Sequence, residues 1–116
     1  MMTNDDADEA FQALHDTQRV ALMLYMDLRD AGNTTGATDA KARASQLQVQ
    51  IDQLINKELA DWQAGAQATI PLLSKSADAA QKAVDRVTKD VQNAQKIDAA
   101  MGALDDAISI AMKVLA

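Results

Sequence analysis

Apolar residues recur at intervals of three and four along almost the whole 116-residue chain, a spacing that places them on one face of an α-helix. Such stripes cover residues 11–28, 40–62 and 73–115. Aromatic residues make up 3 % of the chain, which contains four glycines and one proline. This composition favours long helices and leaves little material for a sheet. The pattern therefore predicts an all-α protein.

Capping and turn residues divide the pattern into three helices. Asn4 is a suitable N-cap for a first helix at about residues 4–31, and Gly32 opens a loop over residues 32–37. Thr38 is a natural N-cap for a second helix at about residues 38–64, which closes around Gly65. Pro71 fits the first turn of a third helix at about residues 70–115. We predict an up-down-up bundle of three long helices, with residues 1–116 forming a single domain.

The third predicted helix is much longer than the other two. At 1.5 Å per residue the first two reach about 40 Å, whereas an unbroken third helix reaches about 70 Å. It therefore either breaks or packs its end against another chain. The weak points lie between Ser74 and Ser76 and at Gly102.

Seven apolar residues, VALMLYM, stand consecutively at residues 20–26, and a helix carries such a run around every face. We expect Leu22 and Tyr25 to face the other helices, while Val20, Met23 and Leu24 meet the C-terminal tail or another subunit. The tail over residues 102–115 is itself too apolar to remain in water. The two surfaces supply the candidate partner-binding residues Val20, Met23, Leu24, Met26, Leu104, Ile108, Met112 and Leu115.

Charge and cysteine content exclude several classes of function. The net charge is −6 and the eleven basic residues are scattered, which argues against nucleic-acid binding through phosphates. Without cysteine, the chain has no disulfide, thiolate nucleophile or cysteine-ligated zinc. Residues 1–11 are acidic where an export signal needs a basic segment, and no apolar run approaches the roughly 20 residues of a membrane-spanning helix. We expect a cytoplasmic protein, and secretion without a signal peptide stays open.

The sequence contains no recognisable catalytic or metal-binding motif. His15 is the only histidine, and no serine, cysteine or second histidine stands at a spacing that completes a triad. A di-iron bundle needs paired Glu-x-x-His motifs, but this chain has only two glutamates, Glu9 and Glu58. We predict that the protein is not an enzyme and has no catalytic residue, cofactor, metal or small-molecule substrate.

The stretch ELADWQAG, which contains Trp62 and Gly65, resembles the central Trp-x-Gly turn of the small secreted helical-hairpin proteins of specialised bacterial secretion. Those proteins are likewise short, acidic and free of cysteine. Here the spacing is Trp-x-x-Gly, the tail lacks the Tyr-x-x-x-Asp/Glu export motif and a third helix is expected, so we do not assign the chain to that family. In the alternative interpretation, Trp62 anchors the core at the end of the second helix and Gly65 caps it.

The leading functional hypothesis is a non-catalytic assembly subunit that binds a protein partner or self-associates through residues 20–26 and 104–115. The flexible methionines of both segments suit an adaptable binding surface. One alternative is a membrane-active protein that lays its apolar helical faces on lipid, and another is a secreted protein of the helical-hairpin type. The polar faces lack the clustered lysines and arginines that attract anionic bilayers, which favours the protein partner.

Overall fold

The structure is a computed structural model that describes residues 2–116. Four α-helices run up, down, up and down: α1 (Asn4–Asp30), α2 (Thr34–Ile55), α3 (Ala66–Lys89) and α4 (Ala94–Leu115). A short 3₁₀ helix, η1 (Leu59–Asp61), lies between α2 and α3, and the described residues include no strand. The all-α class is confirmed, but the prediction of three helices is wrong because the bundle has four.

The third predicted helix is broken at residues 90–93, away from both predicted weak points. Asp90 leaves the helical region with φ −151°, and the Asn93 side chain caps α4 by accepting a hydrogen bond from the Lys96 N–H at 3.1 Å. Asp90 also accepts a hydrogen bond from the Lys96 ammonium at 3.2 Å. The prediction missed this turn because it relied on glycine and small residues, and did not weigh capping by a polar side chain.

Both predicted weak points remain helical. The buried hydroxyl of Ser76 donates to the Leu73 carbonyl at 2.7 Å, so this polar group keeps a partner within its own helix. Gly102 is exposed on α4, and nothing lies within 4 Å of the place where a Cβ would stand. Packing of the buried faces of α3 and α4 outweighs the weak helix propensity at these positions.

The second helix begins and ends earlier than predicted. Its N-cap is Asn33 rather than Thr38, because the Asn33 side chain accepts a hydrogen bond from the Gly36 N–H at 2.9 Å. Thr38 lies inside the helix and donates its hydroxyl to the Thr34 carbonyl. The helix ends at Ile55, so residues 56–65 form a connection in place of the predicted last turns.

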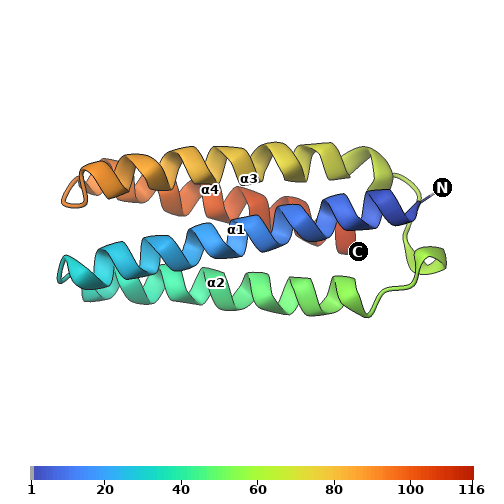
Figure 1. The fold of residues 1–116 in the computed structure, drawn as a ribbon, viewed down its shortest axis with the longest axis horizontal. Coiled ribbons are helices and arrows are strands. Elements are labelled where there is room, and N and C mark those ends of the chain that lie inside the picture. The colour runs from blue at the N-terminus through green and yellow to red at the C-terminus, as the bar shows by residue number, and fades with distance from the viewer. Residues whose placement is uncertain (1) are drawn as a thin grey trace.

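This connection joins two helices that lie diagonally across the bundle. The neighbours of α1 are α2 and α3, and the neighbours of α4 are α3 and α2. Both ends of the described chain lie at the same end of the bundle as the connection (Figure 1). Trp62, only 9 % exposed, anchors the connection in the core as expected. Gly65 caps α3 rather than the second helix, with φ 93° in the left-handed region, so Pro71 lies beyond the first turn of α3.

The first helix has nearly its predicted length but a different orientation. Leu22 was expected to face the core and is 40 % exposed, whereas Val20 and Leu24 are almost completely buried. The buried stripe of α1 includes Ala10 and Ala21, which are both fully covered. The prediction followed the large apolar residues and overlooked the alanines, although alanine lets neighbouring helices approach closely.

The first turn of α1 is closed by a capping box. Thr3 is the N-cap in place of Asn4: its hydroxyl accepts a hydrogen bond from the Asp6 N–H, and its own N–H donates to the Asp6 carboxylate, both at 3.1 Å. The Thr3 N–H, and then the Thr3 hydroxyl, which also donates to the Asp6 carboxylate at 2.9 Å, hold the pKa of Asp6 below its ordinary value of 3.8, and the Gln67 amide 2.7 Å away adds to this.

We expect Thr3→Ala to raise the pKa of Asp6 in part, because alanine keeps the backbone N–H that contributes most and loses only the hydroxyl. Gln67→Ala should raise it less, since the Thr3 hydroxyl lowers the pKa of Asp6 more than the Gln67 amide does. Since the pKa is lowered in the folded state, the stabilisation from Asp6 is present above the unfolded pKa and is lost as the pH falls through the folded pKa. Carbon-detected NMR titration of the Asp6 carboxyl measures each value. An unchanged pKa in Thr3→Ala would contradict the prediction.

The N-cap of α4 at Asn93 leads to a second prediction. Asn93→Ala removes the side chain that accepts the Lys96 N–H, so we expect the free energy of unfolding to fall by about 1 kcal/mol. Gln95→Ala is the matched control, because Gln95 is exposed in the same turn, and its effect should stay within about 0.5 kcal/mol. Urea denaturation followed by circular dichroism measures both, and equal stabilities would argue against the cap.

Candidate functional site

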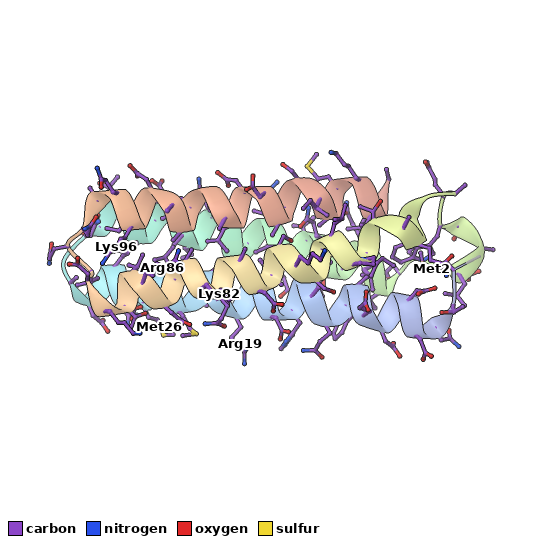
Figure 2. The ribbon with its side chains drawn as sticks, turned by 90° about the horizontal axis from the view of Figure 1, so that it is seen from above. Met2, Arg19, Met26, Lys82, Arg86 and Lys96 are labelled. Carbon is purple, nitrogen blue, oxygen red and sulfur yellow. The ribbon has the colours of Figure 1, made fainter. Side chains whose placement is uncertain are left out.

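The structure divides the eight predicted partner-binding residues into three groups. Four are buried inside the bundle: Val20, Leu24, Leu104 and Ile108. Two are half-buried at its edge: Met23 and Leu115. The other two are exposed: Met26 on α1 and Met112 on α4. Met26 projects from the outer side of α1 (Figure 2). The run VALMLYM is therefore covered mainly by this chain itself, because α1 packs against both α2 and α3.

The single histidine lies on the exposed surface of α1. His15 is exposed and stacks on the Phe11 ring, with the ring centroids 6.0 Å apart. Within residues 2–116, no three histidine, aspartate or glutamate side chains lie close enough together to hold a metal ion. A search of the same residues for a helix with the length and apolar character of a membrane span finds none.

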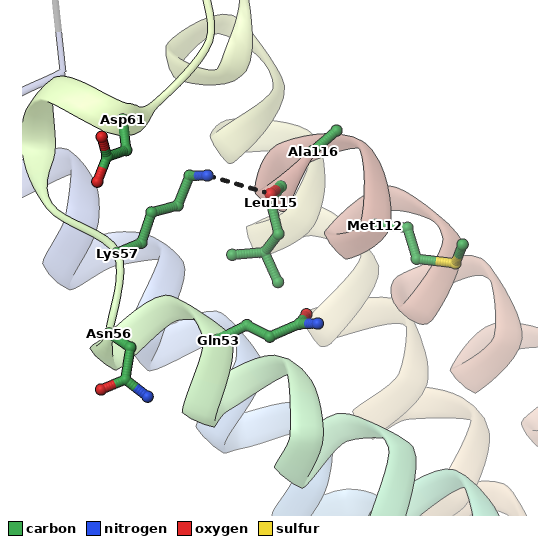
Figure 3. Close-up of a pocket in the computed structure, with 7 residues that line it drawn as sticks. All are labelled: Gln53, Asn56, Lys57, Asp61, Met112, Leu115 and Ala116. Carbon is green, nitrogen blue, oxygen red and sulfur yellow. Dashed lines mark hydrogen bonds between the residues drawn. The ribbon is translucent and has the colours of Figure 1, made fainter.

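A pocket of about 510 Å³ opens where α2 and α4 end (Figure 3). The Lys57 ammonium donates to the Leu115 carbonyl at 3.3 Å and lies 5.8 Å from the centroid of the Trp62 ring. The Trp62 Nε1 is buried and has no acceptor among the described residues. The other residues that line the pocket are Gln53, Asn56, Asp61, Met112 and Ala116. The contacts of Lys57 connect residues 56–65 to the end of α4. We therefore assign Lys57 a structural role in this pocket.

A second pocket, of about 480 Å³, lies along the seam between α1 and α2. Arg29 and Lys41 both lie over the Tyr25 ring, each 5.4 Å from its centroid. A hydrogen bond with Tyr25, followed by the interaction with Asp30, raises the pKa of Arg29. Both cations are engaged by the aromatic ring, so their side chains cover this seam.

Polar side chains bridge three of the four seams between neighbouring helices. The bridging pairs are Gln18–Gln48 between α1 and α2 (2.6 Å), Thr88–Asp27 between α3 and α1 (2.6 Å) and Arg43–Asp105 between α2 and α4 (2.8 and 3.0 Å). The fourth seam, between α3 and α4, differs from these. Among the described residues that line it, no hydrogen bond or ion pair joins one of the two helices to the other.

We call the outer side of this fourth seam the α3–α4 groove. It consists of two hollows of about 510 and 220 Å³ that follow each other along the same two helices. Alanines one turn apart lie on both sides where the hollows meet: Ala79 and Ala83 on α3, and Ala99 and Ala103 on α4. The remaining lining residues are Leu72, Lys75, Ser76, Arg86, Asn93, Gln95, Lys96, Asp106, Ser109, Ile110 and Lys113.

The α3–α4 groove is basic although the chain as a whole is acidic. Four of the eleven basic residues line it, but only one of the seventeen acidic residues does, namely Asp106. Arg86 and Lys96 lie near each other close to the turn that joins the two helices (Figure 2). Lys96 pairs with Asp90 at 3.2 Å, whereas Lys75, Arg86 and Lys113 have no ion-pair partner among the described residues.

Sequence reasoning did not identify this groove. Leu72 directly precedes Leu73 of the predicted stripe and was therefore left out of it, although Leu72 is 51 % exposed on the groove wall. Ile110 was noticed only as part of the apolar tail. The signal that could have revealed the groove is the alanine spacing, with one alanine pair one turn apart on each helix.

Comparison with known proteins yields no relative: no protein-family model, curated protein or solved structure matches this chain. Its geometry and chemistry are therefore the basis for a functional proposal.

The buried and exposed members of the run over residues 20–26 should respond differently to truncation. We expect Leu24→Ala to lower the free energy of unfolding by about 2–5 kcal/mol, because it leaves a cavity in the core. Met26→Ala should change it by less than about 0.5 kcal/mol, since Met26 is 44 % exposed. Chemical denaturation measures both, and similar losses would show that Met26 is also covered, for example by a second subunit.

Proposed function

We propose that this protein is a non-catalytic binding protein that docks a helix of another protein in the α3–α4 groove. The observation that carries the proposal is the exposed apolar wall of a groove that no polar pair bridges. Leu72 is 51 % exposed there, and it lines the same hollow as the half-buried Ile110. An amphipathic helix laid in such a groove covers these side chains with its own apolar face.

The dimensions of the groove suit a helix. Its lining runs along α3 from Leu72 to Arg86, which corresponds to about 20 Å at 1.5 Å per residue. A partner helix of about four turns has the same length. Between the walls, the short alanine side chains at positions 79, 83, 99 and 103 leave room for the partner to approach to the usual helix–helix distance of about 8–10 Å.

The proposal keeps the predicted class of function but moves the interface. Four of the eight residues first expected to meet a partner fill the core of this bundle, and Val20 and Leu24 are examples. A second subunit is therefore not needed to cover the run over residues 20–26. The tail still contributes through Ile110, which lines the groove beside residues of α3.

A library of displayed helical peptides tests the proposal without assuming a partner sequence. We expect peptides selected on the wild-type protein to lose at least about tenfold in affinity for Leu72→Gln, because burying a leucine contributes roughly 1.5–3 kcal/mol. Val49→Gln is the matched control, since Val49 is 57 % exposed on α2 and lies outside the groove. Fluorescence anisotropy of labelled peptides gives each dissociation constant.

Both variants should stay as stable as the wild type, because both side chains are exposed. If the selected peptides bind Leu72→Gln and the wild type equally well, the groove is not the docking site. If no peptide is enriched, helix docking as a function is contradicted.

A further inference from the structure

We infer that the helix bound by the α3–α4 groove is acidic, with carboxylates on both flanks of its apolar stripe. This inference rests on the proposed function and adds the charge of the partner. It follows from where the basic side chains stand along the groove.

The two walls each carry a basic residue at both ends of the groove. Lys75 on α3 and Lys113 on α4 line the first hollow. Arg86 on α3 and Lys96 on α4 line the second (Figure 2). A helix that lies along the groove therefore passes between two pairs of cations. Its apolar stripe faces the alanines, and the residues on its two flanks face the cations.

Three of these cations are not neutralised within the chain. Lys75, Arg86 and Lys113 have no carboxylate within 4.0 Å among the described residues. Lys41 and Lys57 elsewhere in the chain are also without an ion-pair partner, so what sets these three cations apart is their position along the groove. Opposite charges across an interface favour the matching partner and disfavour partners of like charge. The groove thus selects for carboxylates at the partner's flanks.

Asp106 is the single carboxylate among the groove residues, and it lines the first hollow. It repels an acidic partner there, so its removal should strengthen binding. A helix with basic flanks would instead gain from Asp106 and be repelled by the three unpaired cations. The balance of charge favours the acidic helix.

The acidic start of α1 cannot serve as this helix in a second copy of the folded chain. Its most acidic helical stretch is the start of α1, with Asp5, Asp6, Asp8 and Glu9. The apolar residues that follow on α1, such as Ala10 and Leu14, are completely buried in its own bundle. The occupant is therefore a helix of a different protein.

Two synthetic peptides of about 18 residues test the inference, a length at which an isolated helix begins to be populated. Both carry the same leucine and alanine stripe at helical spacing, and the flanking positions are glutamate in one and lysine in the other. Fluorescence anisotropy is measured with the full chain, at about 50 and about 500 mM salt. We expect the glutamate peptide to bind at least about tenfold more tightly at low salt, and the difference to shrink at high salt.

Charge-reversal variants locate the effect. Lys75→Glu combined with Lys113→Glu should weaken binding of the glutamate peptide by at least about tenfold. Arg19→Glu combined with Lys41→Glu is the matched control, because it changes the net charge equally on exposed residues of α1 and α2, which do not line the groove. Asp106→Asn should strengthen binding of the same peptide.

The outcomes separate this inference from the proposed function. If both peptides bind equally and both depend on Leu72, helix docking stands and the acidic partner is refuted. Equal weakening by the two charge-reversal pairs would also refute it, since net charge alone would then explain the attraction. If neither peptide binds but vesicles of phosphatidylcholine and phosphatidylserine do, both proposals fail in favour of a lipid surface.

Discussion

The third helix of the bundle lies beside α1 and diagonally across from α2, and this placement decides how every other element packs. A helix that follows α2 by a short turn would lie next to it, but residues 56–65 instead cross the end of the bundle. Trp62 holds the crossing by burying its ring, and Lys57 ties it to the end of α4. The crossing places α3 rather than α4 beside α1, and α2 and α3 together cover much of the run VALMLYM.

Small side chains determine how close the helices come and what remains open between them. Ala10, Ala21, Ala40 and Ala100 are completely buried, so the helix backbones approach with little side-chain volume between them. On the outer side of α3 and α4 the same residue type has the opposite effect. There no other helix of the described chain covers the alanines. Because their side chains are short, a groove stays open between α3 and α4.

This packing decides which polar side chains find partners across a seam. Where two helices are bridged, as by Arg43 and Asp105, the charges neutralise each other on the surface of the protein. Along the α3–α4 groove the side chains between the walls are too short to make such a bridge, and three of the four basic residues beside them have no ion-pair partner among the described residues. The lack of a polar bridge, the basic lining and the exposed Leu72 together distinguish this surface from the other seams, and they are the reason for proposing a binding function there.

The sequence by itself determined the helical class, nearly the full extent of α1 and the burial of Trp62, because period, composition and side-chain size act locally. It did not reveal the break at residues 90–93, where the Asn93 side chain caps α4 and no glycine or proline marks the turn. Only the tertiary structure decided which face of α1 is buried, because Leu22 and Leu24 are equally apolar and the neighbouring helices choose between them. The groove was likewise beyond sequence reasoning, since Leu72, Lys75 and Lys113 become neighbours only when α3 and α4 fold back on each other.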